Sequence, residues 1–175
     1  MRLRGIAVFG VISAVAMASA SAQTPAKLKV AIMDSKGADV GSATFKPAKH
    51  GVKVKIELMN LPPGPHGVHI HQNAVCEAPA FTTAGGHFNP DAKKHGFDNP
   101  MGHHNGDMPA SVIVGADGKG EASFTLTSLS LDPAAPNSLF AGGGTSIVVH
   151  AKADDEKTDP SGDSGARIAC GVIKN

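Results

Sequence analysis

Period-two alternation of apolar and polar residues constrains the fold of this chain more than any other feature. Leu28, Val30 and Ile32 alternate with polar or small neighbours, and residues 52–58 repeat the pattern. Further short apolar runs lie at residues 112–114, 122–126, 147–149 and 168–173. Short alternating segments broken by Gly and Pro are typical of β-sandwiches and barrels. Because no helical stripe follows the N-terminal region, the sequence predicts an all-β sandwich or barrel.

One stretch, residues 72–109, lacks a strand pattern and is long for a connection inside a compact domain. Such a loop is expected to be functional or tied down by other bonds. It contains Cys76 and four histidines. A second irregular stretch, residues 151–165, is rich in Asp, Lys and Gly. With no internal repeat and 41% hydrophobic residues, residues 23–175 are expected to form one domain with its own core.

The first 22 residues have the pattern of an export signal. Arg2 and Arg4 precede an apolar run, residues 6–18, that is too short to span a bilayer and is followed by small residues. We predict a signal peptide over residues 1–22 and a periplasmic or secreted domain over residues 23–175. After cleavage 14 basic and 15 acidic residues remain, so the formal charge changes from +1 to −1. A formal charge this close to zero gives no reason to expect a nucleic-acid partner. Without the signal peptide, no membrane attachment is expected.

The chain has two cysteines, Cys76 and Cys170. In an oxidising compartment an even pair is typical of a disulfide, which stabilises a chain with a loop of this length by about 4–5 kcal/mol in the loop-entropy treatment. The alternative is a pair of zinc thiolates. It is less favoured, because neither residue has a second cysteine in C-x-x-C spacing.

Histidines on predicted strands indicate a metal site. His69 and His71 lie two residues apart, so on a strand both imidazoles point to the same face. His150 directly follows the apolar run 147–149 and can lie on another strand of the same framework. Three imidazoles on a rigid β framework are a suitable donor set for copper.

The long loop contains a second set of metal donors. His87, His95, His104 and Asp107 follow one another at gaps of eight, nine and three residues. Three imidazoles and one carboxylate make a closed, four-coordinate site of the kind that zinc prefers. A zinc hydrolase is disfavoured, because it would need an open position on the metal.

Six motifs resemble those of the copper–zinc superoxide dismutase family in its exported bacterial form. They lie at residues 64–71, 85–90, 94–96, 104–107, 149–155 and 165–171. The resemblance implies a Greek-key, immunoglobulin-like β-sandwich or flattened barrel with long metal-binding and electrostatic loops. It implies an enzyme that converts superoxide to dioxygen and hydrogen peroxide, with copper as the redox metal and zinc as the structural metal.

The resemblance also implies the ligands of each metal and the partner of each cysteine. Copper would be bound by His69, His71, His87 and His150, and zinc by His87, His95, His104 and Asp107. The bridging residue would therefore be His87. A disulfide between Cys76 and Cys170 would anchor the long loop to the last strand.

Catalytic roles follow from the same resemblance. His87 would supply a proton to the departing peroxide, and Arg167 would attract the superoxide anion beside copper. Because the chain after residue 22 has a slightly negative charge, this attraction has to be local. Lys152 and Lys157 are further candidates for the same field.

The remaining polar candidates are expected behind or outside the two sites. Asp154 would hydrogen-bond to histidines of both sites, and His66 would be a structural histidine. His50 lies in a polar turn, where exposure is expected. His103 adjoins His104, but only His104 has the x-Gly-Asp sequence after it.

Two other functions are weighed against the dismutase. A dismutase-like periplasmic copper-binding protein without dismutase activity would have lost catalytic residues, whereas the three copper-only histidines and Arg167 are all present. A copper-delivery protein would use Met and Cys for Cu(I), yet the methionines form no cluster. Because family members occur as monomers and as dimers, the sequence leaves a homodimer open.

Overall fold

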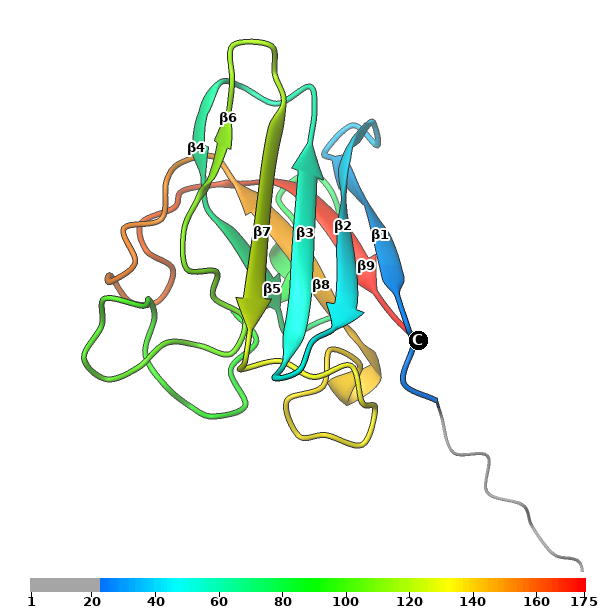
Figure 1. The fold of residues 1–175 in the computed structure, drawn as a ribbon. Helices are drawn as coiled ribbons and strands as arrows, with labels where there is room; N and C mark the ends of the chain where they lie inside the picture. The colour runs from blue at the N-terminus through cyan, green and yellow to red at the C-terminus, as the bar shows by residue number, and fades with distance from the viewer. Residues whose placement is uncertain (1–22) are drawn as a thin grey trace, which may run out of the picture.

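The computed structural model describes residues 23–175, which form one all-β unit with long loops (Figure 1). The predicted signal peptide, residues 1–22, lies outside the described residues. The strands are β1 Leu28–Asp34, β2 Asp39–Pro47, β3 Val52–Leu58, β4 Gly64–His66, β5 Val68–His71, β6 Val112–Val114, β7 Gly120–Leu126, β8 Thr145–His150 and β9 Arg167–Ile173. Two 3-10 turns, η1 Thr82–Ala84 and η2 Ala141–Gly143, complete the elements.

The strands form one antiparallel sheet in the order β4-β6-β7-β3-β2-β1-β9-β8-β5. The sheet folds over, so that β7, β3 and β2 lie in front of β8 and β5 (Figure 1). The two edge strands are consecutive in the chain and are separated only by Gly67. Since the chain passes from β4 into β5 through this one residue, the two edges of the sheet lie next to each other and the sheet forms a nearly closed, flattened barrel. The predicted fold class is confirmed.

Alternation places one face of each strand in the core. In β3, Val52, Val54, Ile56 and Leu58 are buried, as the sequence predicted. Strand β2 was absent from the sequence prediction. It packs Ala43 and Phe45 inward, but Gly41 and Ser42 interrupt the apolar pattern of its first half.

Two long loops cover the face of β5 and β8 that points away from this core. The loop after β5 has only η1 as regular structure, and the segment between β8 and β9 has none. A disulfide joins Cys76 in the first loop to Cys170 in β9, so the predicted pairing is confirmed. No helix among the described residues has the length and apolar character needed to cross a membrane.

Candidate metal centre

Strands β5 and β8 position three histidines by alternation. Val68 and Ile70 of β5 point into the core, so His69 and His71 both point to the opposite face. Because His69 pairs with Val148 and β8 alternates in the same way, His150 lies on that face too. All three imidazoles are nearly inaccessible to solvent. The expectation that they share one β framework is confirmed.

The loop after β5 returns beside this face and brings the other donors with it. The Phe88 amide donates to the Ile70 carbonyl at 2.8 Å, and the Ile70 amide donates to the Gly106 carbonyl at 2.8 Å. A Cβ at position 106 would lie 2.3 Å from the Ile70 carbonyl oxygen, so this approach requires glycine. These bonds place His87 and Asp107 directly beside β5.

Four histidines turn one ring nitrogen each toward a common point. One ligand atom from each of His69, His71, His87 and His150 lies within 4.8 Å of the other three. In His69 this nitrogen is Nδ1, and in His71, His87 and His150 it is Nε2. Each of these four atoms is buried and has no hydrogen-bond partner. Buried polar atoms are almost always paired, so four unpaired lone pairs facing one another indicate a metal site.

The opposite nitrogens of these rings are held by hydrogen bonds. His71 Nδ1 donates to the Gly85 carbonyl at 3.0 Å, and His150 Nδ1 donates to the Gly165 carbonyl at 3.2 Å. His69 Nε2 donates to the Asp154 carboxylate. Such bonds select the tautomer whose lone pair faces the metal and hold the ring in place.

A second set of donors surrounds one carboxylate oxygen. Asp107 Oδ1 lies 2.8 Å from His87 Nδ1, 3.1 Å from His95 Nδ1 and 3.3 Å from His104 Nδ1. His87 Nδ1 and His104 Nδ1 are 3.3 Å apart. The edge of a tetrahedron around zinc, with bonds of about 2.0–2.1 Å, is about 3.3 Å long. The spacing of these four atoms therefore suits a closed zinc site.

His69 also lies close to this second set. Ligand atoms of His69, His87, His95 and Asp107 are within 4.8 Å of one another, so proximity alone would place His69 with Asp107 instead of His104. The hydrogen bonds favour His104. The Nε2 atom of His69 is bonded to Asp154, whereas His104 Nδ1 directly approaches both His87 and Asp107.

His87 and Asp154 connect the two sets. His87 Nδ1 faces Asp107 while its Nε2 faces the first set. Behind the rings, Asp154 accepts from His69 Nε2 through Oδ2 and from His95 Nε2 at 3.0 Å through Oδ1. The predicted link between the sites through these two residues is therefore present in the geometry.

Burial and charge set the protonation of both sets. Burial lowers the pKa of His69 to about 3 and that of His150 to about 4, and it lowers the pKa of His71 and His87 as well. These imidazoles are neutral near pH 7 and keep their lone pairs. Burial would also lower the pKa of His95, but its bonds to Asp107 and Asp154 outweigh this effect and raise it to about 10.

The two carboxylates stay ionised although they are buried. Burial alone would raise the pKa of Asp107 and Asp154. Contacts from His104, His87 and His95 hold the pKa of Asp107 far below its usual range, and bonds from His69 and His95 do the same for Asp154. Each carboxylate therefore supplies a full negative charge beneath the imidazoles.

Arg167 lies at the entrance to the first set. A hollow of about 600 Å³ is lined by the buried residues His71, His87, His104 and His150, and Arg167 is the one cation of Lys or Arg type among its described lining residues. Its Nη1 and Nη2 donate to the carbonyls of Phe81 and Gly85 at 2.7 and 2.6 Å. Burial lowers the pKa of Arg167, but an arginine stays charged in proteins. Lys152 and Lys157 do not line the hollow.

The other histidines lie outside both sets. His66 is buried, with Nδ1 2.7 Å from the His150 carbonyl oxygen and Nε2 2.8 Å from that of Pro62. Both ring nitrogens are therefore occupied by backbone partners. His103 stacks on Phe97 with ring centroids 3.9 Å apart, and His50 is exposed.

Sequence reasoning missed residues that support the site through the backbone. Asp159 accepts from the His95 amide at 2.8 Å and from Lys94 Nζ at 2.7 Å. The Gly85 carbonyl accepts from both His71 and Arg167. Neither contact has a local sequence signal, because the partners come from distant segments.

Comparison with known proteins gives consistent matches over most of the chain. Residues 40–173 match the sequence profile of the family described as copper/zinc superoxide dismutase. Superoxide dismutase [Cu-Zn] 1 of Aquifex aeolicus is 44% identical over 146 residues, which cover 82% of this chain and 85% of that protein. The crystal structure of a SOD-like protein from Bacillus subtilis is 39% identical, with a TM-score of 0.79, and the match covers 83% of this chain and 97% of that one. The Cu/Zn superoxide dismutase from Brucella abortus is 28% identical, with a TM-score of 0.67, and the match covers 85% and 99%.

Proposed function

Because this chain belongs to the copper/zinc superoxide dismutase family, we propose that its buried histidine cluster is the active centre of a superoxide dismutase. The substrate is superoxide, the products are dioxygen and hydrogen peroxide, and the cofactors are copper and zinc. When bound, copper supplies one-electron redox chemistry, whereas zinc, which has no redox chemistry, supplies structure. Residues of this chain hold the metals, bind the substrate and transfer the proton.

In this proposal His69, His71, His87 and His150 bind copper. The observation that carries the proposal is the convergence of four buried imidazole nitrogens without hydrogen-bond partners. Imidazole suits copper, and the low pKa values of these rings keep the lone pairs free. Hydrogen bonds at the opposite nitrogens hold the rings ready for the metal.

Zinc is assigned to His87, His95, His104 and Asp107. Their donor atoms surround Asp107 Oδ1 at 2.8 to 3.3 Å. Asp107 Oδ2 accepts from the amides of Gly96 and His104 at 2.9 and 3.0 Å, which leaves Oδ1 for the metal. A four-coordinate set closes the zinc site and fixes the loop that carries His87.

Arg167 and His87 act on the substrate in this proposal. The guanidinium of Arg167 binds the superoxide anion in the hollow, and its two bonds to backbone carbonyls fix its position there. His87 lines the hollow, and its Nε2 can carry a proton to the departing peroxide, because Nδ1 is held on the Asp107 side. The Asp154 carboxylate holds the orientation of the His69 and His95 rings by accepting a hydrogen bond from each.

The test replaces His71 with Ala and measures copper, zinc and dismutase activity. Because His71 belongs only to the first set, copper content and activity should be lost while zinc stays bound. The matched control is His103→Ala, since His103 is a histidine of the loop after β5 that stacks on Phe97 and lies outside both sets. A His71→Ala protein that retains copper and the wild-type rate contradicts the assignment.

The second candidate is a dismutase-like copper-binding protein without dismutase activity. This candidate is considered because a structure similar to this chain is described as that of a SOD-like protein. The accessible hollow with Arg167 beside the histidines favours the enzyme. A protein loaded with both metals that leaves superoxide unconsumed would support this second candidate instead.

We also propose export, with residues 1–22 as a cleaved signal and residues 23–175 as the dismutase domain in the periplasm or outside the cell. The disulfide between Cys76 and Cys170 supports an oxidising location. N-terminal sequencing of the protein recovered from the periplasmic or secreted fraction should begin at Gln23. Recovery from the cytoplasm with Met1 or Arg2 at the N-terminus contradicts the proposal.

A further inference from the structure

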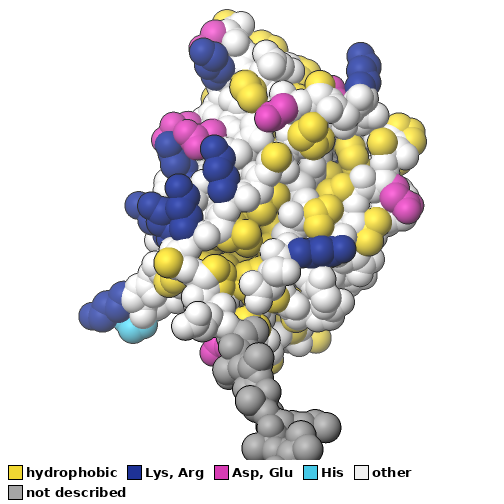
Figure 2. Space-filling view, turned by 90° about the vertical axis from the view of Figure 1, so that its right-hand side faces the viewer, with side chains coloured by type: hydrophobic (Ala, Val, Ile, Leu, Met, Phe, Trp, Pro, Cys, Tyr) yellow, Lys and Arg dark blue, Asp and Glu magenta, His cyan; other side chains and the backbone are white. Residues whose placement is uncertain are grey.

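Five lysines gather on the outer side of β1, β2 and β3, and we call this surface the lysine face. It consists of Lys27, Lys29, Lys46, Lys53 and Lys55. Inward residues of the same strands, such as Phe45 and Val54, lie in the core. Lysine side chains therefore project from the opposite side. In Figure 2 dark-blue side chains gather on the left flank, which is the side toward the viewer in Figure 1.

Strand register brings like charges directly against one another. Lys46 pairs with Lys53 across β2 and β3, and Thr44 lies between Lys29 on β1 and Lys55 on β3. Like charges directly opposite in a sheet destabilise it. Among the described residues only Lys55 of this face has carboxylate partners, Glu57 at 2.9 Å and Glu121 at 3.2 Å. The other four lysines form no ion pair with the described residues, although Lys27 and Lys29 lie near enough to Glu57 to act on its charge.

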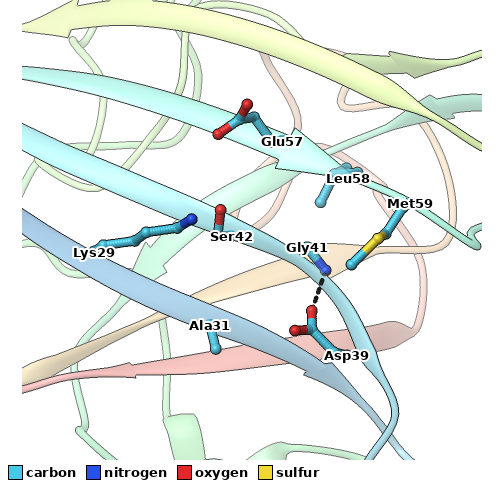
Figure 3. A pocket seen from close by; sticks show the side chains of 8 residues that line it. All are labelled: Lys29, Ala31, Asp39, Gly41, Ser42, Glu57, Leu58 and Met59. Carbon is cyan, nitrogen blue, oxygen red and sulfur yellow. Dashed lines mark hydrogen bonds between the residues drawn. The ribbon is translucent and has the colours of Figure 1, made fainter.

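The lysine face is hollowed at its centre. The short side chain of Thr44 leaves a depression of about 420 Å³, lined by the five lysines, Thr44 and Glu57. Lys29 and Glu57 also line the neighbouring depression, shown in Figure 3, where Asp39, Ser42 and Met59 replace the other lysines. Lysines therefore dominate the first depression, whereas acidic, polar and apolar side chains replace most of them in the second.

We propose that the lysine face docks the protein on an anionic lipid surface, with lipid phosphates seated among the lysines. The face is a broad array on three adjacent strands, which suits a planar partner. Its lining contains no arginine and no aromatic side chain, so it lacks the groups that usually read bases or stack on them. Electrostatic attraction without apolar insertion is typical of polybasic contacts with anionic bilayers.

Docking in this orientation leaves the metal centre accessible. The lysine face belongs to the layer of β2 and β3, whereas the histidines are carried by β5 and β8 in the other layer. The sequence led us to expect no membrane contact, because the overall charge is near zero and the lysines are spread from residue 27 to residue 55. Their convergence exists only in the folded sheet, and it needs no membrane-spanning segment.

The test measures cosedimentation of the purified, metal-loaded protein with lipid vesicles. Vesicles of phosphatidylcholine with phosphatidylglycerol should bind the protein at low salt, and binding should fall steeply toward physiological salt, where screening acts within about 8 Å. Vesicles of phosphatidylcholine alone should not bind it. Mass spectrometry of the sample should confirm that residues 1–22 are removed, since an apolar leader would bind both kinds of vesicle.

Variants separate the lysine face from overall charge. Each basic residue near an anionic surface strengthens partition about fivefold, so Lys46→Glu with Lys53→Glu should weaken it by at least about twentyfold. The matched control is Lys36→Glu with Lys119→Glu, which makes the same charge change in the exposed β1–β2 and β6–β7 turns at the other end of the sheet, about 20 Å away. The control should lose less than about threefold.

A single variant distinguishes a loss of vesicle binding from a loss of folding. Lys46→Glu places a carboxylate opposite Lys53, so it should raise the midpoint of thermal unfolding while it weakens vesicle binding. Equal losses in both double variants, or equal binding to neutral vesicles, would overturn the proposal. Tighter binding to duplex DNA than to anionic vesicles at the same salt would also overturn it, in favour of a nucleic-acid surface.

Discussion

Asp154→Asn tests whether one buried carboxylate prepares the copper site. Asp154 Oδ2 accepts from His69 Nε2, whereas Oδ1 accepts from His95 Nε2 at 3.0 Å and from the Glu156 amide at 2.7 Å. The Asn side chain has nearly the same shape but only one acceptor oxygen. Because position Oδ1 receives two donors, the amide oxygen should occupy it, and the NH₂ group then faces His69.

The expected magnitude follows from the tautomer of His69. An NH₂ donor opposite Nε2 favours the neutral tautomer with its proton on Nδ1, which is the atom that faces the other copper ligands. Copper binding then requires the other tautomer of His69, and the variant lacks the hydrogen bond from Nε2 to a charged carboxylate. The lost bond costs about 1.5–3 kcal/mol. Copper affinity should fall about 10- to 100-fold, which is the usual effect of removing such a supporting partner. Zinc affinity should fall less, since His95 keeps its acceptor.

The assay is competition of the folded, metal-free protein against chelators of known affinity, with copper and zinc measured separately. Asp155→Asn is the matched control, because Asp155 is exposed and its side chain accepts, among the described residues, only from Lys157 and Thr158 of its own turn. Unchanged copper affinity in a folded Asp154→Asn protein would refute the reasoning. So would a loss of zinc that exceeds the loss of copper.

Three further predictions concern the disulfide, the entrance and pH. Cys76→Ser should lower the free energy of unfolding by about 4–5 kcal/mol, measured by denaturant titration, while thiol titration of the denatured, unreduced wild type should find no free thiol. Arg167→Glu should keep both metals but lower the rate by about one to two decades in pulse radiolysis, and a full rate with metals bound would exclude this role. In the metal-free protein, the folded-state pKa values of about 3 for His69 and about 4 for His150 lie below the unfolded value of 6.5. The unfolded chain therefore binds more protons in that window, and the free energy of unfolding should fall as pH drops from 6.5 to 4; a flat profile would contradict the assigned burial.

Much of the fold could be predicted from local sequence, and so could most of the histidines that the structure brings together, whereas the place of His87 in both sets was implied only by the family resemblance. The alternation in residues 28–32 and 52–58 predicts strands because the strand period is two, and β1 and β3 confirm it. The same period places His69 and His71 on one face, with Val68 and Ile70 on the other. Strand β2 escaped prediction because the small residues Gly41 and Ser42 blur its alternation, although its pairing with β1 and β3 makes it central to the sheet.

Spacing along the chain determined which residue types could serve a metal, and only the tertiary structure decided which atoms meet. His87 joins both sets because Nδ1 faces Asp107 while Nε2 faces the other histidines. His66 is excluded by backbone carbonyls at both ring nitrogens, and the lysine face exists only through the register of three strands. The physical reason is range: alternation acts over neighbouring residues, whereas ring orientation, burial and pKa depend on partners from distant segments that closure of the barrel brings together.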